Sequence, residues 1–468
     1  MTRVAIIGGG ISGLAAAYAL EELKRDSNAA VQYALYEASP RFGGALRTEQ
    51  VEGCFTIEAG PDSFLTEKPQ AADLCRALGL GDQLIGSNDI QRTTYVALRN
   101  RLVPLPDGLM FMVPTRIAAT LRSPLFSWRA KLQMARELLQ TPRSSEEDES
   151  VASFVERHYG REMVDRLADP LLSGVYGGSA SILSVRAVLP RFVEMERATG
   201  SLGRAMIDVR NKTRASGLTM PPLFTSLKGG LQQLVDALVS RLPPSSLLAR
   251  ASVQALQLEE IGGWTVSAGM KSDQFDAVIL ALPAHASAAL LSNQTPDLAA
   301  ELGAIPYTSS ITVALGYGPD VRHSLLPGFG FLVPRSEGRH LLAATFVHNK
   351  FPHRAPPDHA LLRCFIASQK ADSVWNCSDD AIVDIVRGDL QNILGIAAEP
   401  LFSRVYRWRS AMAQYTVGHL ERLARIERLI QSLRGLALAG NGYRGIGISD
   451  CIRSGFDAAR RALGAENA

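Results

Sequence analysis

The chain has 468 residues, of which 46% are hydrophobic and 20% are charged, and its formal net charge is +3 at pH 7. This length fits two or three domains, and the composition is that of a globular protein with a full hydrophobic core. The small net charge gives no reason to expect nucleic acid as a partner. Because the sequence has no run of about 18 apolar residues, we expect no membrane-spanning helix.

The cysteines and histidines give no sign of a metal site. The five cysteines and eight histidines are scattered, and His348 and His353 lack the spacing of a helical zinc pair. An odd number of cysteines without metal-ligand spacing favours free thiols in a reduced, cytoplasmic setting. The apolar start at residues 4–7 is too short for a signal peptide.

The N-terminal region predicts a strand, a helix and a second strand. Residues 3–7 are a short apolar run that ends at glycine, residues 12–24 have helical periodicity, and residues 31–37 are a second apolar run. This order of elements is the βαβ start of a parallel sheet.

Between the first strand and the helix, three glycines have the G-x-G-x-x-G spacing of a dinucleotide-binding turn. Gly8 allows the tight turn, Gly10 lets backbone amides approach a pyrophosphate, and Gly13 allows close packing of helix and strand. Glu37 ends the second strand, where its carboxylate suits the ribose hydroxyls of an adenosine. The sequence therefore predicts dinucleotide binding.

Three further segments favour FAD over NAD. The RFGGALRT segment, with Arg41, Gly44 and Arg47, can wrap the pyrophosphate from its other side, and Gly60–Ser63 form a tight polar turn near the flavin. Near the C-terminus, a strand at 436–439 is followed by a glycine-rich loop and a helix at about 449–463. That helix N-terminus would direct amides and positive dipole at the flavin N1 and O2 edge, which stabilises the reduced ring.

The middle of the chain has a different character. Residues 100–143 predict short basic amphipathic helices broken at Pro114 and Pro124, with Lys131 among the basic residues. One interpretation is a helical subdomain with its basic face in water, and the other is contact with an anionic membrane surface or an acidic substrate. Residues 144–150 predict an acidic loop in which Ser150 caps the next helix.

The remaining pattern completes the predicted fold. A helix at about 229–241 precedes alternating strands at 251–259, 264–268, 277–282, 311–317 and 341–346. We expect an α/β fold with α+β elements: a Rossmann-type FAD-binding domain of discontinuous segments, a mixed-sheet substrate domain and a helical subdomain. The expected boundaries are 1–66, 221–283 and 401–468 for the FAD domain, 67–100, 186–220 and 284–400 for the substrate domain, and 101–185 for the helical subdomain.

Seven motifs distributed over nearly the whole chain carry a family resemblance. They are GGGISGLAAAY, SPRFGGALRT, LLSGVYGG, SLKGGLQQL, PGFGFLVPRSEG, KFPHRAP and AGNGYRGIGISDCI. The sequence resembles the oxygen-dependent proto- and coproporphyrinogen oxidases of haem synthesis, within the FAD-dependent amine oxidase superfamily.

The resemblance implies a set of cofactor and substrate residues. The implied FAD contacts are Gly8, Gly9, Gly10, Ile11, Ser12, Gly13, Glu37, Ala38, Arg41, Gly44, Arg47, Gly60, Pro61, Asp62, Ser63, Val253, Trp408, Gly447, Ile448 and Ser449. The implied substrate-cavity residues are Gly174, Leu332, Thr345 and Phe365. Simple packing is the alternative role for the cavity residues and for Trp408. No general base, nucleophile or metal ligand is implied.

At three positions the chain differs from related groups of enzymes, and these differences narrow the class of substrate that we expect. Amine oxidases typically carry a lysine near flavin N5 where this chain has Thr312, and an aromatic cage residue where it has Ile446. An uncharged, uncaged cavity suits a flat macrocycle better than a small amine. The eukaryotic protoporphyrinogen oxidases carry a propionate-binding arginine where this chain has Thr94, with Arg92 two places earlier. Its loss puts protoporphyrinogen IX in doubt and leaves room for coproporphyrinogen III.

The implied reaction is a six-electron oxidation of a porphyrinogen in three FAD-dependent steps, with dioxygen as acceptor and peroxide as product. The resemblance also allows peripheral contact with the inner face of the cell membrane, a monomer or homodimer, and handover to the next haem-pathway enzyme. Two alternatives stay open: an amine oxidase or carotenoid desaturase on the same fold, and a non-enzymatic escort protein for lipid-modified GTPases. Porphyrin fluorescence that depends on oxygen separates the first, and a colourless protein after FAD addition indicates the second.

Overall fold

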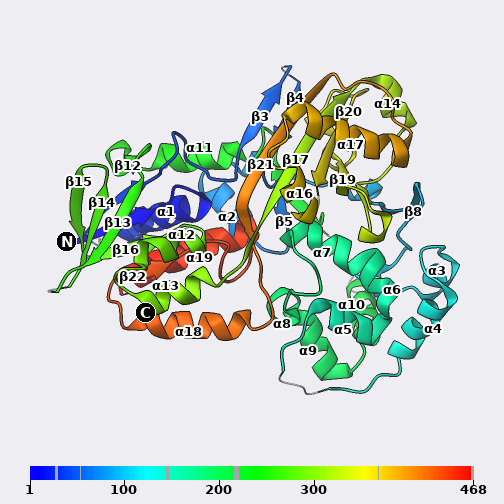
Figure 1. Cartoon of the computed structure of the whole chain (residues 1–468), viewed down its shortest axis with the longest axis horizontal. Coiled ribbons are helices and arrows are strands. Elements are labelled where there is room, and N and C mark those ends of the chain that lie inside the picture. Colours follow the sequence, from blue (N-terminus) through cyan, green and yellow to red (C-terminus); the bar gives the residue numbers. More distant parts are fainter. Residues whose placement is uncertain are drawn as a thin grey trace.

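The computed structural model describes residues 1–26, 30–52, 54–143, 147–215, 221–260, 262–366 and 368–464. Three regions are visible in Figure 1: a parallel sheet flanked by helices at the left, a mixed sheet at the upper right, and a group of helices at the lower right. Strand β21 (Phe402–Ala413) and helix α18 (His419–Gln431) return the chain from the mixed sheet to the parallel sheet.

The first region is a five-stranded sheet with the order β12-β2-β1-β16-β22. All its strand pairs are parallel. Its strands are β1 (Thr2–Ile7), β2 (Val31–Tyr36), β12 (Leu247–Leu248), β16 (Ala277–Leu280) and β22 (Leu436–Leu438). The predicted βαβ start is confirmed by β1, by helix α1 (Ile11–Asp26) and by β2.

Both faces of this sheet are covered, which explains why its strands are continuous apolar runs. Val4 and Ile6 of β1 pack with α1 and with the helices α2 (Gln70–Ala77), α11 (Gln232–Arg241) and α19 (Ile448–Ala462). The alternate residues Ala5 and Ile7 pack against a second layer. That layer consists of α12 (Ala284–Leu291), α13 (Pro296–Gly303), α18 and the antiparallel strands β13 (Val253–Leu258), β14 (Trp264–Ala268) and β15 (Lys271–Phe275).

The second region is a seven-stranded mixed sheet with the order β21-β17-β20-β19-β18-β7-β8. Its neighbours are antiparallel except for β18 and β7, which are parallel. Besides β21, its strands are β17 (Tyr307–Tyr317), β20 (Ala360–Ile366), β19 (Leu341–Phe346), β18 (Gly330–Leu332), β7 (Thr94–Leu98) and β8 (Arg101–Pro104). One face packs on α14 (Pro319–Ser324), α16 (Ser368–Val374) and α17 (Asp379–Leu394). The expected mixed-sheet domain is confirmed.

The third region is a group of helices around one hydrophobic cluster. They are α3 (Ile117–Arg122), α4 (Trp128–Glu137), α5 (Val151–Tyr159), α6 (Arg161–Met163), α7 (Asp169–Tyr176), α8 (Val185–Val188), α9 (Pro190–Thr199) and α10 (Leu202–Ala215), with a π-helical turn at Val164–Ala168. The Ser150 hydroxyl accepts a hydrogen bond from the Ser153 amide, so the predicted N-cap of α5 is confirmed. Residues 144–146 of the predicted acidic loop lie outside the described residues.

Short elements connect the three regions. They are β3 (Thr48–Val51), β4 (Phe55–Glu58), β5 (Phe64–Leu65), β6 (Leu84–Gly86), β9 (Leu109–Met110), β10 (Val113–Pro114), β11 (Phe224–Leu227), α15 (Val347–Lys350) and the 3-10 turns Gly81–Gln83, Asp89–Gln91, Pro244–Ser246, Arg335–Glu337 and Pro352–Arg354. In the part of the chain that the structure describes, no helix is long and apolar enough to cross a membrane. All five cysteines are free.

The prediction of helices over all of residues 100–143 was wrong in its first third. Residues 101–114 form β8, β9 and β10, because Pro104, Pro106 and Gly108 interrupt any helix there. Lys131 does not belong to an exposed basic face either. Its side chain is buried, and its ammonium donates to the Leu121 carbonyl at 2.8 Å.

The hydrophobic clusters favour boundaries that differ from the three expected ones. Helices α9 and α10 share the cluster of the helical region, not the substrate sheet. Helices α12 and α13 pack on the parallel sheet, although they lie within the segment 284–400. Strand β21 belongs to the mixed sheet, although it follows residue 401. We propose these changes because a domain is defined by the core in which its residues are buried.

Candidate cofactor and substrate site

Two of the three motif glycines are required by the packing of the protein itself. Gly8 has a φ of +107°, and a Cβ atom there would lie 2.4 Å from the Ala281 carbonyl oxygen. A Cβ on Gly13 would lie 1.9 Å from the Gly8 carbonyl oxygen. Both positions therefore need glycine whether or not a ligand is bound.

Gly10 is different, because the space beside it is free of protein. A Cβ atom on Gly10 would meet only the Cα of Gly44, at 4.0 Å. Gly43 holds the facing loop in place by donating its amide to the Gly9 carbonyl at 2.7 Å. The result is a cradle between two glycine turns at the N-terminus of α1, which fits a pyrophosphate bound by helix amides.

Glu37 is held beside this cradle by the backbone. Its two carboxylate oxygens accept hydrogen bonds from the amides of Gly9 (2.7 Å) and Ser39 (2.8 Å). The Ala251 amide donates to the Glu37 carbonyl at 2.8 Å, so the chain leading to Val253 runs alongside. Glu37 therefore lies beside the cradle, and Val253 lies two residues from the chain that is bonded to it. Their contacts to FAD remain predictions.

The two arginines of the RFGGALRT segment do not have the same surroundings. Arg41 donates to the carbonyl oxygens of Phe42, Gly44 and Leu46 at 2.7–3.2 Å. Arg41 therefore organises the loop that faces the cradle. The side chain of Arg47 is half-exposed and pairs with Glu49 at 2.5 Å. For both arginines, a direct contact to the pyrophosphate remains a prediction.

The C-terminal glycine loop and its helix close against the same cradle. Gly447 is the N-cap of α19, and Ser449 donates its hydroxyl to the Lys68 carbonyl at 3.0 Å. A Cβ on Gly455 would lie 2.3 Å from the Ser12 carbonyl oxygen, so α19 crosses α1 in direct backbone contact. The middle of α19 thus packs on the first turn of α1, although more than 400 residues separate the two helices in the sequence.

Tyr415 shapes the C-terminal loop, although it was not among the predicted site residues. Its hydroxyl donates to the Asn441 carbonyl and accepts from the Gly445 amide, both at 2.8 Å. This bridge fixes the two ends of the glycine-rich segment. A tyrosine in the QYTVG segment carries no local signal for such a contact.

The structure brings together the substrate-cavity residues that lie on strands. In register, Leu332 pairs with Ala343, Ala343 with Phe365, and Phe365 with Thr312. Side chains of paired residues point to the same face of a sheet, and so do alternate residues of one strand. Thr345 and Trp408 therefore share this face, which is opposite to the face covered by α17. We call it the cavity face. Gly174 lies on α7 and is exposed.

The turn at residues 59–63 joins the cradle to the cavity face. Trp408 donates its indole N–H to the Ala59 carbonyl at 3.0 Å. A Cβ on Gly60 would lie 2.0 Å from the carbonyl oxygen of Ala45, which follows Gly44. A continuous path of contacts therefore leads from Gly10 through this turn to the mixed sheet.

Buried charged side chains form a network under this turn. Of these residues, only Asp62 was predicted as a site residue. Asp62 is paired with Lys350, whose ammonium lies 3.1 Å from Oδ2, and Arg363 lies 3.9 Å from the same oxygen. Arg354 pairs with Glu58 at 3.2 Å, and both side chains are 1% exposed. The sequence does contain a signal for Arg363, because this arginine interrupts the otherwise apolar strand LLRCFI.

Burial and charge act in opposite directions on this network. Burial raises the pKa of Glu58, and Arg354 only partly opposes this shift. For Asp62, burial would also raise the pKa, but Lys350, Arg363 and Arg354 together hold it well below its ordinary value. Burial lowers the pKa of Lys350, with Asp62 opposing. Asp62 is therefore a carboxylate that stays ionised.

His348, two residues before Lys350, makes stability depend on pH. Its side chain is buried, Nδ1 lies 3.1 Å from the backbone of Leu361, and burial lowers the pKa to about 4 from an ordinary value of 6.5. The unfolded chain therefore binds more protons between these pH values, so this contribution is present above pH 6.5 and is lost as pH falls towards 4.

We expect this histidine to lower the free energy of unfolding by about 2 kcal/mol between pH 7 and pH 5. Urea unfolding at both pH values checks this expectation. His348→Gln should reduce the difference between the two pH values by that amount, whereas the exposed His323→Gln should not. An unchanged difference in His348→Gln would show that this histidine is not the cause.

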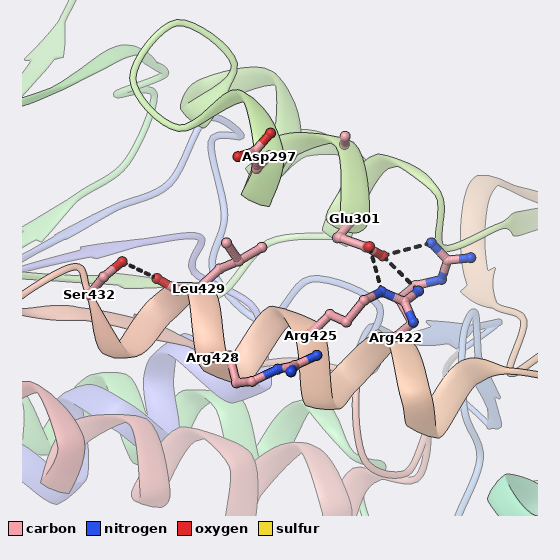
Figure 2. A pocket seen from close by; sticks show the side chains of 8 residues that line it. Asp297, Glu301, Arg422, Arg425, Arg428, Leu429 and Ser432 are labelled. Carbon is pink, nitrogen blue, oxygen red and sulfur yellow. Dashed lines mark hydrogen bonds and ion pairs between the residues drawn. The ribbon is translucent and has the colours of Figure 1, made fainter.

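One surface pocket lies away from the predicted cofactor and cavity residues. A pocket of about 580 Å³ lies between α13 and α18. Glu301 accepts hydrogen bonds from Arg422 and Arg425 in this pocket (Figure 2). Arg428 and Asp297 also line it. None of the predicted cofactor or cavity residues does, so we do not assign the chemistry to this pocket.

The geometry defines a class of protein before any comparison. A pyrophosphate cradle at the carboxyl ends of a parallel sheet, closed by a second helix N-terminus and joined to a mixed sheet, is the arrangement of an FAD-binding oxidoreductase with a separate substrate domain. The chain belongs to the family of flavin containing amine oxidoreductases, which matches residues 11–463. This membership confirms the prediction of FAD as the cofactor.

Individual relatives that match over nearly the whole chain indicate which members of this family it resembles. The chain is 34% identical over 471 residues to a coproporphyrinogen III oxidase of Bacillus subtilis, covering 98% of both chains. It is 32% identical to the protoporphyrinogen oxidase of Homo sapiens, covering 99% of this chain and 98% of that protein. A crystal structure from Exiguobacterium sp. 255-15 has a TM-score of 0.87 at 31% identity, covering 100% of this chain and 99% of the other. The resemblance inferred from the motifs is confirmed.

Proposed function

We propose that this enzyme oxidises a porphyrinogen to the porphyrin, and that dioxygen restores the oxidised cofactor. The observation that carries the proposal is the near-complete similarity to porphyrinogen oxidases, together with the uncharged residues Leu332, Thr345, Phe365 and Thr312 on the cavity face. When bound, FAD accepts a hydride from the substrate. Three such steps remove three hydrides, which carry six electrons and three protons, and three further protons leave the substrate. Together they convert three dioxygen molecules into three hydrogen peroxide molecules.

In this proposal the protein binds and orients, and it performs no covalent step. The uncharged residues of the cavity face exclude water and give a flat macrocycle a surface on which to lie. Arg363, which pairs with Thr345 on the same face, adds one buried positive charge. The turn at 59–63 and Trp408 keep that surface in register with the cradle. The helix N-terminus at Gly447 contributes positive dipole, which favours a reduced, negatively charged ring. We assign no side chain the role of general base.

Among porphyrinogens, we propose coproporphyrinogen III as the substrate. Position 94 pairs with Gly330, which pairs with Thr345, so it lies on the cavity face. A threonine there cannot hold a propionate as an arginine would. This difference supports a substrate held by propionates at other positions of the ring, as a tetra-propionate allows.

The test is to prepare both porphyrinogens anaerobically and to record porphyrin fluorescence when oxygen is admitted. We expect faster formation of coproporphyrin than of protoporphyrin, with stoichiometric peroxide. A faster reaction with protoporphyrinogen IX would reverse the choice of substrate. If neither porphyrin forms on FAD-loaded protein, porphyrinogen oxidation is ruled out.

We also propose peripheral membrane contact through α3 and α4. Exposed apolar side chains gather there, with Trp128 at 74%, Leu132 at 54% and Leu139 at 80% exposure. Arg122 and Arg129 are exposed between them. Apolar side chains flanked by arginines favour the interface of an anionic bilayer.

Sedimentation with anionic liposomes at low salt tests this contact. Burial of one leucine side chain contributes about 2 kcal/mol, so Leu132→Glu and Leu139→Glu should each weaken binding by about tenfold or more. Met270→Glu is the matched control, because Met270 is fully exposed on the β14–β15 hairpin, far from α4 in the fold. Equal sedimentation of all variants would contradict the proposal.

A further inference from the structure

The charge network under the 59–63 turn contains more cations than carboxylates. Among the residues that the structure describes, Lys350, Arg354 and Arg363 face two carboxylates within ion-pair distance, those of Glu58 and Asp62. All five side chains are buried, with exposures between 1% and 13%. A buried charge without a counter-ion is unfavourable, so such an excess indicates a negative charge supplied from elsewhere.

The cations differ in whether each one has a carboxylate of its own. Arg354 donates to Glu58 at 3.2 Å, to the Asp62 carbonyl at 3.3 Å and to the Ser226 hydroxyl at 2.6 Å. Lys350 donates to both Asp62 oxygens and to the Ser63 hydroxyl at 3.1–3.2 Å, and Arg363 lies 3.9 Å from the same carboxylate, so these two cations share one counter-ion. The unbalanced positive charge therefore belongs to the Lys350 and Arg363 pair.

This pair lies at the seam between the two halves of the site. Arg363 donates to the Gly60 carbonyl, and its guanidinium lies 4.8 Å from the ring centre of Phe365 on the cavity face. Gly60 packs on Ala45, beside the Gly44 and Gly10 cradle. A cofactor bound in the cradle with its reactive end at the cavity face has to pass this seam.

We propose that Lys350 and Arg363 are positioning residues whose positive charge stabilises negative charge on the flavin ring. The inference rests on the proposed function, because it requires the ring to lie at the cavity face. Fixed charges in a buried site act over several ångströms with little screening, so no direct contact with the ring is needed. Asp62 moderates the effect, since it is the carboxylate that both cations share. The inference therefore predicts opposite effects for removal of a cation and removal of Asp62.

The probe is sulfite, which adds reversibly to oxidised flavin and leaves negative charge on the ring. The experiment titrates sulfite into FAD-loaded protein and follows the loss of visible flavin absorbance. Lys350→Met should raise the dissociation constant for sulfite about tenfold, which corresponds to a two-electron potential about 30 mV lower. Asp62→Asn should lower the dissociation constant, because it leaves both cations uncompensated. A direct measurement of the flavin midpoint potential should shift in the same directions.

The matched control removes a cation from the other face of the same sheet. Arg407 pairs with Asp379 at 2.6 Å, on the side covered by α17, so Arg407→Met should leave sulfite binding unchanged. The double variant Lys350→Met with Asp62→Asn removes one cation and one carboxylate, so the net charge of the network equals that of the wild type. This variant replaces the single variants in the test if either of them folds poorly. Its sulfite affinity should be close to that of the wild type.

The outcomes separate the inference from the proposed function. Wild-type sulfite affinity and potential in Lys350→Met and in Asp62→Asn, each with normal FAD content, would overturn the inference. Shifts of the same sign in both variants would overturn it as well. Opposite shifts in a protein that forms no porphyrin would support the inference while overturning the proposed reaction.

Discussion

Replacement of Gly10 by valine is expected to give a folded protein that no longer retains FAD. Outside its chain neighbours, a Cβ atom on Gly10 would meet only the Gly44 Cα, at 4.0 Å, so the fold leaves room for a side chain there. The same side chain would occupy the pyrophosphate cradle. We expect FAD binding to weaken by about 100-fold or more, or about 2.7 kcal/mol. Flavin absorbance after FAD addition and desalting, with circular dichroism for folding, measures both parts of the prediction.

Two other glycines serve as matched controls. Gly388 in α17 also has free space around it but lies on the far side of the mixed sheet, so Gly388→Val should retain FAD. Gly13→Val should fail to fold, because its Cβ would lie 1.9 Å from the Gly8 carbonyl oxygen. Normal FAD retention by Gly10→Val would place the pyrophosphate elsewhere. Misfolding of Gly10→Val would show that Gly10 serves packing, as Gly13 does.

Replacement of Arg354 by methionine is expected to destabilise the protein by about 3–5 kcal/mol, the range for breaking a buried ion pair. The Arg354 side chain is 1% exposed and has three partners on two separate segments: Glu58 and the Asp62 carbonyl on one, and Ser226 on the other. Methionine fills similar volume but leaves the Glu58 carboxylate buried without a counter-ion, with only the Leu231 amide and the Thr48 hydroxyl as donors in the described part of the chain. Urea unfolding, followed by fluorescence and far-UV circular dichroism, measures the loss.

An exposed pair of the same type provides the control. Arg460 pairs with Asp457 at 3.3 Å, with both side chains more than half exposed, and Arg460→Met should cost less than about 1 kcal/mol. The double variant Arg354→Met with Glu58→Gln should be more stable than the two single losses predict, because no unpaired charge stays buried. A loss below about 1 kcal/mol in Arg354→Met would mean that water replaces the guanidinium.

The cofactor domain could be predicted from the sequence because its signals are local. A glycine spacing, the turn it imposes and the helix that follows are contained within residues 8–13, and Glu37 ends the adjacent strand. Strand β1 was recognisable because both its faces are buried, which leaves a continuous apolar run. Local sequence was misleading at residues 101–114, where apolar side chains beside prolines form short strands.

The roles of the glycines and charges were decided only by the tertiary structure. The motif treats Gly8, Gly10 and Gly13 as equivalent, but the surrounding atoms show that only Gly10 faces free space. Asp62 and Lys350 are 288 residues apart in the sequence and come from different regions of the fold. Periodicity and spacing describe neighbours along the chain. They cannot describe a contact that depends on how two sheets, each built from distant segments, are packed together.

The glycine turn, the FAD assignment and the family resemblance were therefore determined by the sequence itself. The sharing of one sheet face by Leu332, Thr345, Phe365 and Trp408 required the strand register. The tertiary structure was also required to place the cations Lys350 and Arg363 beside the 59–63 turn. The physical reason is that register and burial are set by long-range pairing of strands, and these two properties decide which side chains a ligand can meet.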